Sequence, residues 1–109
     1  MPVKQGDVYW YTFRQPDKRR PVLILTRNSA ISFLTSVTVV PITTTIRSIP
    51  SEVLLSAADG MFTECAVNAD NVQTVLKSRM GALITSLSPR VMREVRMAVE
   101  FALGLDALL

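Results

Sequence analysis

The sequence has no histidine and only one cysteine, Cys65. A single cysteine cannot form an internal disulfide, and the usual zinc-binding sets cannot be assembled without histidine or further cysteines. Histidine is also the most common general base, so enzyme classes that depend on it are excluded. We therefore expect Cys65 to be a small buried hydrophobic residue, and we expect neither a metal nor another cofactor.

Long hydrophobic runs and targeting signals are missing as well. The longest uninterrupted apolar run covers residues 22–25, whereas a membrane-spanning helix needs roughly 20 apolar residues. The first ten residues, MPVKQGDVYW, contain no hydrophobic secretory region. The sequence therefore predicts a protein that does not enter the membrane and stays in the cytoplasm.

Length and composition indicate one small, unusually apolar domain. The chain has 109 residues, too few for two self-supporting cores, so we expect a single domain over residues 1–109. Hydrophobic residues make up 49% of it and the mean hydropathy is +0.30. So small a particle cannot bury that much apolar surface, which predicts a homodimer interface. The net charge of +3 suits a polyanionic partner without establishing one.

Most of the chain reads as short β-strands. Segments rich in β-branched and aromatic residues alternate with turn residues, a pattern typical of a small barrel. The polar stretch 14–19 reads as a loop, and Pro41 marks an edge or a bulge. The expected strands are residues 6–13, 21–26, 36–43, 52–55, 65–68, 72–75 and 82–86.

The end of the chain changes to a helical period. Ser88 is a natural N-cap, Pro89 fits the first helical position and Gly104 is placed to end the helix. Between these signals, apolar residues recur on one stripe, which predicts an amphipathic helix packed on the barrel. The stripe consists of Val91, Val95, Ala98, Val99, Ala102 and Leu103.

Arginine, hydroxyl and amide groups remain as the carriers of chemistry, because the sequence has no glycine-rich phosphate loop, nucleophile elbow or carboxylate cluster for Mg²⁺. They concentrate in KRRP (18–21), PITTTIR (41–47) and NADNVQT (68–74). The guanidinium fork of arginine matches phosphate oxygens, and threonine hydroxyls can add hydrogen bonds. RNA carries its own nucleophile, the 2′-OH, so its cleavage needs only positioning, charge stabilisation and proton transfer.

Five motifs carry a resemblance to a known family. GDVYW, RRPVLIL, VTVVPITTTIR, CAVNADNVQTV and the helix that begins with Ser-Pro occur in this order. Over nearly the whole chain, this arrangement resembles the MazF/PemK/Kid toxins. The resemblance implies a mainly β fold with α structure, a small SH3-like β-barrel (PemK/CcdB-like) with a C-terminal amphipathic helix. It also implies a homodimer and a MazE-like antitoxin partner.

The same resemblance implies an activity and its residues. Family members are metal-independent, sequence-specific endoribonucleases that leave a 2′,3′-cyclic phosphate and a 5′-OH. The catalytic arginine corresponds to Arg20 before Pro21, and the catalytic threonine to Thr43. The resemblance assigns Asp70 and Asn71 to base recognition. Arginine is a poor base with a pKa above about 12, so an electrostatic role suits Arg20 better, and Asp70 is an alternative proton acceptor.

Further residues are candidates for RNA binding. Basic side chains near the expected strand ends could follow the phosphate backbone, although such side chains are often only solvated. Trp10 could stack on a base, whereas alternation along its strand could equally bury it. Bases are read most readily in unpaired RNA, so the expected substrates are mRNA and exposed loops of rRNA or tRNA. The remaining candidates are Lys18, Arg19, Arg27, Thr44, Thr45 and Arg47.

Two alternatives stay open at this stage. A toxin on the same fold could poison DNA gyrase without catalytic residues of its own, as CcdB does, because fold does not determine function. The chain could also be a catalytically silent RNA-binding barrel, whose sequence would look much the same. The joint occurrence of Arg20 and Thr43 in their motifs favours the nuclease.

Overall fold

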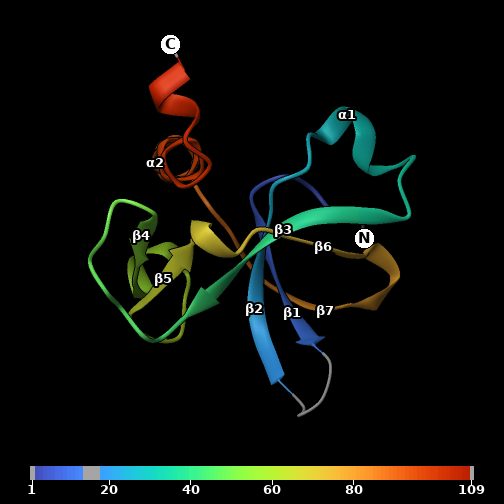
Figure 1. Ribbon diagram of the computed structural model, residues 1–109. Helices are drawn as coiled ribbons and strands as arrows, with labels where there is room; N and C mark the ends of the chain where they lie inside the picture. Colours follow the sequence, from blue (N-terminus) through green and yellow to red (C-terminus); the bar gives the residue numbers. More distant parts are fainter. Residues whose placement is uncertain (1, 14–17, 109) are drawn as a thin grey trace.

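The computed structural model describes residues 2–13 and 18–108 (Figure 1). Antiparallel strands dominate, with one main helix beside them. The strands are β1 (Asp7–Phe13), β2 (Lys18–Ile24), β3 (Ser36–Thr43), β4 (Glu52–Leu55), β5 (Cys65–Asn68), β6 (Gln73–Leu76) and β7 (Met80–Ser86). The helices are α1 (Asn28–Ile31), α2 (Pro89–Ala102) and the short 3-10 turns η1 (Ala57–Asp59), η2 (Ala69–Asn71), η3 (Lys77–Arg79) and η4 (Leu105–Leu108).

Strand β3 is the hub of the sheet. The strand order is β4-β5-β3-β2-β1-β7, and β6 pairs with β3 off this path. Along one edge of β3, the pairing with β6 ends at Val39 and the pairing with β5 begins at Ile42. Pro41 falls in the gap between these two ladders, where a residue without a backbone N–H is tolerated. It therefore marks a break in the pairing along one side of a central strand, rather than the predicted edge or bulge.

The coarse fold prediction is confirmed, but the sheet is not closed. In the described part of the chain, β4 and β7 form the two ends of the pairing path and do not pair with each other. The structure is therefore a strongly curved antiparallel sheet with one main helix. None of its described helices is both long and apolar enough to cross a membrane.

The strand boundaries agree closely with prediction, although four strands are shifted. The strands at 36–43, 52–55 and 65–68 are confirmed. Strands β1 and β6 each begin one residue later than expected, β7 begins two residues earlier, and β2 ends at Ile24 rather than at residue 26. Strand β2 begins at Lys18, which pairs with Phe13 of β1. The polar loop predicted up to residue 19 is therefore too long, because hairpin pairing with β1 extends the strand despite its polar side chains. Residues 14–17 of that predicted loop lie outside the described residues.

The apolar run in β2 is buried on both faces of the sheet. Leu23 packs in one hydrophobic cluster with Val8 and Val40, whereas Val22 and Ile24 pack in a second cluster on the other side. All three β2 residues are fully buried. Continuous rather than alternating hydrophobicity is what a strand covered on both sides requires.

Helix α2 packs on the first of these clusters, next to β4 and η2 (Figure 1). Ser88 accepts a hydrogen bond from the Val91 N–H, and Gly104 adopts a φ of 73° just beyond the helix, as the sequence predicts. The buried stripe consists of Val91, Val95 and Ala98. The prediction that Leu103 belongs to it is wrong: Leu103 is 58% exposed, because the helix ends at Ala102.

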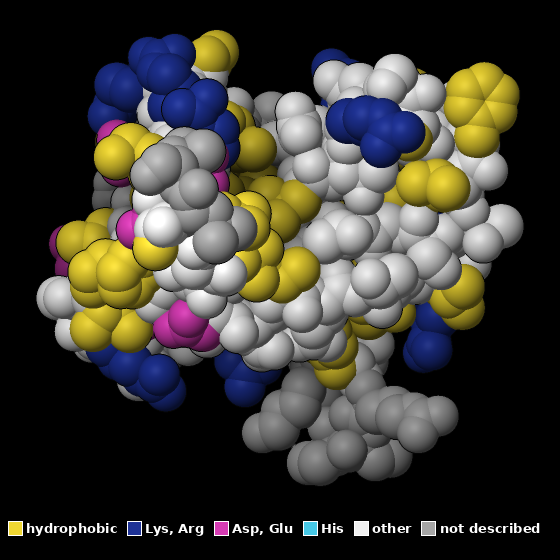
Figure 2. All heavy atoms as spheres, turned by 45° about the horizontal axis from the view of Figure 1, so that its top comes forward, with side chains coloured by type: hydrophobic (Ala, Val, Ile, Leu, Met, Phe, Trp, Pro, Cys, Tyr) yellow, Lys and Arg dark blue, Asp and Glu magenta, His cyan; other side chains and the backbone are white. Residues whose placement is uncertain are grey.

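Basic side chains occur in more than one region of the face seen in Figure 2. Several lie together at the upper left and others lie singly, with hydrophobic side chains between them. A single electropositive patch therefore does not mark a binding site on this face.

Candidate functional site

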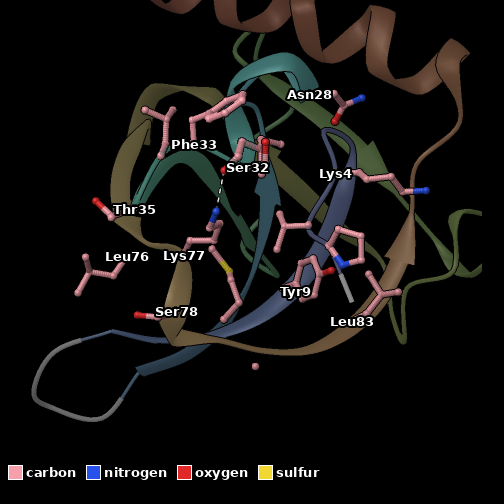
Figure 3. A pocket seen from close by; sticks show the side chains of 16 residues that line it. Lys4, Tyr9, Asn28, Ser32, Phe33, Thr35, Leu76, Lys77, Ser78 and Leu83 are labelled. Carbon is pink, nitrogen blue, oxygen red and sulfur yellow. Dashed lines mark hydrogen bonds between the residues drawn. The ribbon is translucent and has the colours of Figure 1, made fainter.

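An apolar groove of about 1390 Å³ lies between the N-terminal segment, α1, η3 and β7 (Figure 3). Phe33, Leu76 and Leu83 line it and are 85%, 46% and 49% exposed. Across it, the Lys77 ammonium donates a 2.7 Å hydrogen bond to the Ile31 carbonyl. Two lysines, Lys4 and Lys77, are in its lining, but Lys77 is engaged by the Ile31 carbonyl and no described residue of the motifs rich in arginine and threonine reaches the groove.

Arg20 and Thr43 lie together on adjacent strands. Val22 of β2 pairs with Pro41 of β3, and the two strands are antiparallel. Arg20 lies two residues before Val22 and Thr43 lies two residues after Pro41, so in an antiparallel pair both lie toward the same end. The structure thus brings the two residues predicted to be catalytic to the same place in the sheet.

Two pockets meet at this pair. The first, which we call the aromatic pocket, has a volume of about 390 Å³ and includes Trp10, Arg19, Thr44 and the segment around Phe62 in its lining. The second, which we call the amide pocket, also has a volume of about 390 Å³. Its lining residues are Phe13, Arg20, Pro41, Thr43, Asn68, Asn71 and Gln73. Both pockets are lined by Arg20 and Thr43, so this pair forms their common wall.

The hydroxyl group of Thr43 is oriented by its own chain. Its Oγ1 accepts a hydrogen bond from the backbone N–H of Thr45 at 3.1 Å. A hydroxyl carries one donor and two acceptor positions, so its proton stays available for another acceptor. A phosphate oxygen in either pocket is such an acceptor, and the Arg20 guanidinium supplies positive charge beside it.

The aromatic pocket contains a stacked pair of rings and a cation. The rings of Trp10 and Phe62 are nearly parallel, 16° apart, with centroids 6.0 Å from each other. The guanidinium carbon of Arg19 lies 4.2 Å from the centroid of the Trp10 ring. Phe62 is nevertheless 75% exposed. These groups present aromatic and cationic surface next to Arg20 and Thr43.

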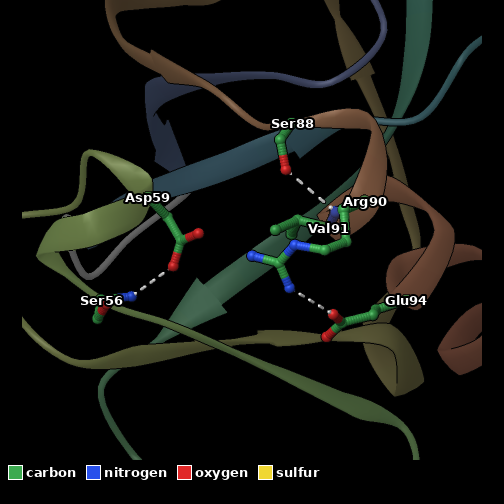
Figure 4. A network of polar contacts seen from close by, with 6 residues as sticks. All are labelled: Ser56, Asp59, Ser88, Arg90, Val91 and Glu94. Atoms are coloured by element: carbon green, nitrogen blue, oxygen red, sulfur yellow. Dashed lines mark hydrogen bonds and ion pairs between the residues drawn. The ribbon is translucent and has the colours of Figure 1, made fainter.

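The turn that leads to Phe62 is held by several hydrogen bonds. The Ser56 N–H donates to Asp59 Oδ2 at 2.9 Å, and the Ala58 N–H donates to Ser56 Oγ, which makes a capping box around η1 (Figure 4). The Thr85 hydroxyl of β7 donates to the Asp59 carbonyl at 3.0 Å. Figure 4 also shows Arg90 of α2 paired with Glu94 at 3.3 Å. The start of the Phe62 segment is therefore anchored to the sheet.

Cys65 lines the aromatic pocket but is buried, only 3% exposed, as the sequence predicts. Burial, followed by the negative charge of Asp59, raises the pKa of the thiol above its ordinary value. The nucleophilic form of cysteine is the thiolate, so the raised pKa keeps the group unreactive at neutral pH. Cys65 is therefore a packing residue rather than a nucleophile.

The structure gathers about half of the predicted site residues. Those lining the two pockets are Trp10, Arg19, Arg20, Thr43, Thr44 and Asn71. Thr45 contributes its backbone N–H to Thr43. Lys18 begins β2, and its side chain lies outside the described part of the chain.

Three predicted residues lie apart from this group. Asp70 lines neither pocket, and its Oδ2 accepts a 2.6 Å hydrogen bond from Ser51 Oγ. Arg27 precedes α1 and lines a separate hollow. The Arg47 backbone N–H is bound by Glu52 Oε1, and its side chain lies outside both pockets. The prediction that all three share the site is therefore not supported by their placement.

Sequence reasoning missed several lining residues, and three of them bear on the proposals below. Asn68 and Gln73 lie in the NADNVQT segment, which was singled out for its amides, so this signal was present. Phe62 gave no local signal, because a phenylalanine between two turns looks like an ordinary apolar residue. Within the described residues, no three His, Cys, Asp or Glu side chains gather to hold a metal ion.

A comparison with protein-family models gives one match that covers most of the chain. Residues 4–103 match the model of the PemK-like, MazF-like toxin of type II toxin–antitoxin systems. The chain belongs to this family.

Individual members of the MazF family agree with this assignment. Endoribonuclease MazF3 of Mycobacterium tuberculosis is 46% identical over 79 residues, which cover 69% of this chain and 77% of that protein. The solved structure of toxin MazF-mt6 from M. tuberculosis is 35% identical, with a TM-score of 0.82 over 90% of this chain and 96% of that one. A mycobacterial endoribonuclease solved with its cognate antitoxin is 31% identical, with a TM-score of 0.84 over 94% and 96% of the two chains.

Proposed function

We propose that this MazF-family toxin is a metal-independent, sequence-specific endoribonuclease that cuts single-stranded RNA at the junction of the aromatic and amide pockets. Its relatives are endoribonucleases, and the chain is an endoribonuclease toxin of a toxin–antitoxin system by family. The observation that carries the proposed site is the shared wall formed by Arg20 and Thr43. A phosphate at this wall has nucleotide-sized hollows on both sides.

The proposed reaction uses the nucleophile of the substrate. The 2′-OH loses its proton and attacks the adjacent phosphorus, while the bond to the 5′-oxygen breaks and that oxygen takes up a proton. The products are a 2′,3′-cyclic phosphate and a 5′-OH. Arg20 stabilises the negative charge on the phosphoryl oxygens, and the Thr43 hydroxyl donates a hydrogen bond to one of them.

The two hollows divide the recognition of the RNA. The amide groups of Asn68, Asn71 and Gln73 offer donors and acceptors that can read base edges, which are accessible only in unpaired RNA. Backbone tracking is left to Arg19 and to Lys18. The proposed substrates are therefore mRNA and the exposed loops of rRNA or tRNA, and duplex RNA should resist cleavage.

The proposed partners are an antitoxin and a second copy of the chain. An acidic, flexible segment of a MazE-like antitoxin would cover Arg19 and Arg20 and exclude RNA, ordering as it binds. A second copy would cover the apolar groove of Figure 3, whose exposed side chains Phe33, Leu76 and Leu83 are costly to leave in water. Both partners suit a protein that acts in the cytoplasm. The strong curvature of the sheet is the basis for proposing an SH3-like barrel.

The alternative functions are less well supported. Gyrase poisoning is not favoured, because the family relatives are endoribonucleases. A catalytically silent RNA-binding protein differs only in the absence of strand scission. One cleavage assay therefore separates it from the proposal.

The decisive experiment incubates the purified, antitoxin-free protein with mixed-sequence single-stranded RNA in excess EDTA and maps the cut ends. Cleavage at a short recurring motif with cyclic phosphate ends, lost in Arg20→Ala and Thr43→Ala, supports the proposal. Arg93→Ala and Thr74→Ala are matched controls, because both residues are exposed and line neither pocket. Intact RNA from the folded wild-type protein, tried on several substrates, contradicts it.

A further inference from the structure

The aromatic pocket offers more than phosphate chemistry requires. Arg20 and Thr43 suffice to hold a phosphate, yet the same hollow is lined by the stacked rings of Trp10 and Phe62. Other large hydrophobic side chains of this chain are exposed too, so exposure alone does not distinguish Phe62. What distinguishes it is its parallel alignment with a second ring beside a cation and a phosphate-binding pair.

Phe62 is also held in place rather than free to turn inward. Its preceding neighbour Met61 is 6% exposed, and Cys65, three residues later, is 3% exposed. The Met61 N–H donates to the Ser56 carbonyl at 3.3 Å, which ties this segment to the capped turn η1. A ring presented to solvent from an anchored segment is ready to accept a flat ligand at a low entropic cost.

The position of the ring pair selects the ligand. A nucleobase is flat, presents a π-face whatever its identity, and is linked to a phosphate that Arg20 and Thr43 can hold. A hydrophobic side chain of a peptide could also pack on Phe62, but it brings no phosphate to the adjoining pair. The Arg19 guanidinium at Trp10 adds positive charge, which favours the polyanion.

We propose that Phe62 and Trp10 form a stacking subsite for one unpaired nucleobase next to the phosphate bound at Arg20 and Thr43. The subsite deepens the proposed ribonuclease function and rests on it. Stacking tolerates any base, so this subsite supplies affinity and fixes the position of the RNA strand relative to Arg20 and Thr43. Discrimination between bases then belongs to the amide pocket on the other side of the pair.

The test measures binding separately from cleavage. The probe is a short single-stranded RNA spanning the mapped cut, with 2′-deoxyribose at the nucleotide whose 2′-OH would attack, so that it binds but cannot react. Should no cut be found, an unmodified random-sequence pool of short single-stranded RNA takes its place, because there is then no cleavage to prevent. Trp10 is the only tryptophan of the chain, so quenching of its fluorescence reports on this pocket directly.

Three variants isolate the role of Phe62. Phe62→Ala removes the exposed ring, Phe62→Tyr keeps an aromatic face, and Phe101→Ala is the matched control, because Phe101 is a 48% exposed phenylalanine of α2 that lines neither pocket. We expect Phe62→Ala to weaken probe binding about 5- to 100-fold and to reduce the quench. Phe62→Tyr and Phe101→Ala should bind like the wild type.

Removal of single bases identifies the partner of Phe62. One abasic position in the probe should weaken binding to the wild type by a similar factor but leave binding to Phe62→Ala almost unchanged. Equal losses in both proteins at every position would overturn the subsite, as would unchanged RNA binding by Phe62→Ala. Weakening of antitoxin binding alone would instead show that Phe62 receives a peptide, and would overturn it too.

The two proposals fail in different ways. Binding and quenching that depend on Phe62, without any strand scission of unmodified RNA, would leave the subsite standing and refute the nuclease. Cleavage that is lost in Arg20→Ala, with no effect of Phe62→Ala on binding, would do the reverse. A wild-type protein that binds no RNA at all refutes the subsite.

Discussion

The Oγ1 atom of Thr43 accepts a hydrogen bond from the backbone N–H of Thr45 at 3.1 Å. This contact occupies an acceptor position of the hydroxyl and leaves its proton to donate elsewhere. The backbone of Thr45 thus orients the Thr43 hydroxyl at the end of β3 as a hydrogen-bond donor. If this donor stabilises the transition state, its removal should be felt in the rate rather than in folding.

The first prediction concerns this donor. Thr43→Val keeps the shape of the side chain but removes the hydroxyl, so the rate of RNA cleavage should fall about a hundredfold, as for a lost transition-state hydrogen bond. Thr43→Ser keeps the hydroxyl and should retain most of the activity. Single-turnover cleavage rates measure both effects, and equal rates for the Val variant and the wild type would remove Thr43 from the reaction.

A second prediction concerns the loop between β3 and β4. Oε1 of Glu52 accepts hydrogen bonds from the backbone N–H groups of Arg47 and Ser48, at 2.9 and 3.1 Å. Ser48 has a φ of 56°, a conformation that non-glycine residues rarely adopt, so the loop depends on these contacts. Glu52→Ala should lower the free energy of unfolding by about 1–3 kcal/mol. Glu52→Gln keeps an acceptor and should lose less in the same denaturant titration.

The third prediction compares two glycines. Gly60 and Gly104 have φ values of 93° and 73°, where side chains are strained. A Cβ at Gly60 would also collide with the side chain of Thr85, whereas nothing lies within 4 Å at Gly104. Gly104→Ala should cost about 1–2 kcal/mol of stability, and Gly60→Ala about 2–5 kcal/mol. Chemical denaturation measures the difference, and equal costs would show that the collision is relieved.

The fourth prediction concerns alkaline pH. Burial, followed by the charge of Asp59, raises the pKa of Cys65 above 9.0. Burial, followed by the charge of Asp7 and a hydrogen bond to it, raises the pKa of Tyr9 above 10.0. Between the ordinary and the raised pKa, the unfolded chain releases protons that the folded chain retains, so rising pH favours unfolding.

Stability should therefore hold up to about pH 9 and fall above it. Denaturant titrations across this range measure the fall. Cys65→Ala should remove the thiol's contribution to the slope of the unfolding free energy against pH, even if the substitution also changes the packing of the core. A Cys65→Ala slope identical to that of the wild type would show that the thiol titrates alike in both states.

The fifth prediction tests the proposed homodimer. Leu83 is 49% exposed and lines the apolar groove of Figure 3. Leu83→Glu should leave the monomer folded but place a charge in the interface, so the protein should shift from dimer to monomer in light scattering. Leu54→Glu is the matched control, because Leu54 is 59% exposed and lies on β4, away from the groove. Dimers that survive Leu83→Glu would place the interface elsewhere.

The helix and most strands could be predicted from the sequence because their signals are local. Ser88, Pro89 and Gly104 mark helix α2 through capping chemistry that involves only neighbouring residues. The continuous apolar run in β2 indicates burial on both faces without knowledge of what covers them. Arg20 and Thr43 were predicted differently, through the resemblance of the motifs that contain them to the MazF/PemK/Kid toxins.

Tertiary structure alone decided what surrounds that pair. Phe62 enters the site because η1 is fastened to β7 by the Thr85 hydroxyl, a contact between residues far apart in the chain. The Asp70 carboxylate accepts a hydrogen bond from Ser51, 19 positions earlier, and lines neither pocket. Periodicity and turn preferences depend on a few neighbouring residues, whereas a pocket depends on how segments that are distant in the chain pack against one another. The sequence therefore predicts the strands, the helix and the pair of Arg20 and Thr43, whereas the folded sheet determines which residues surround that pair.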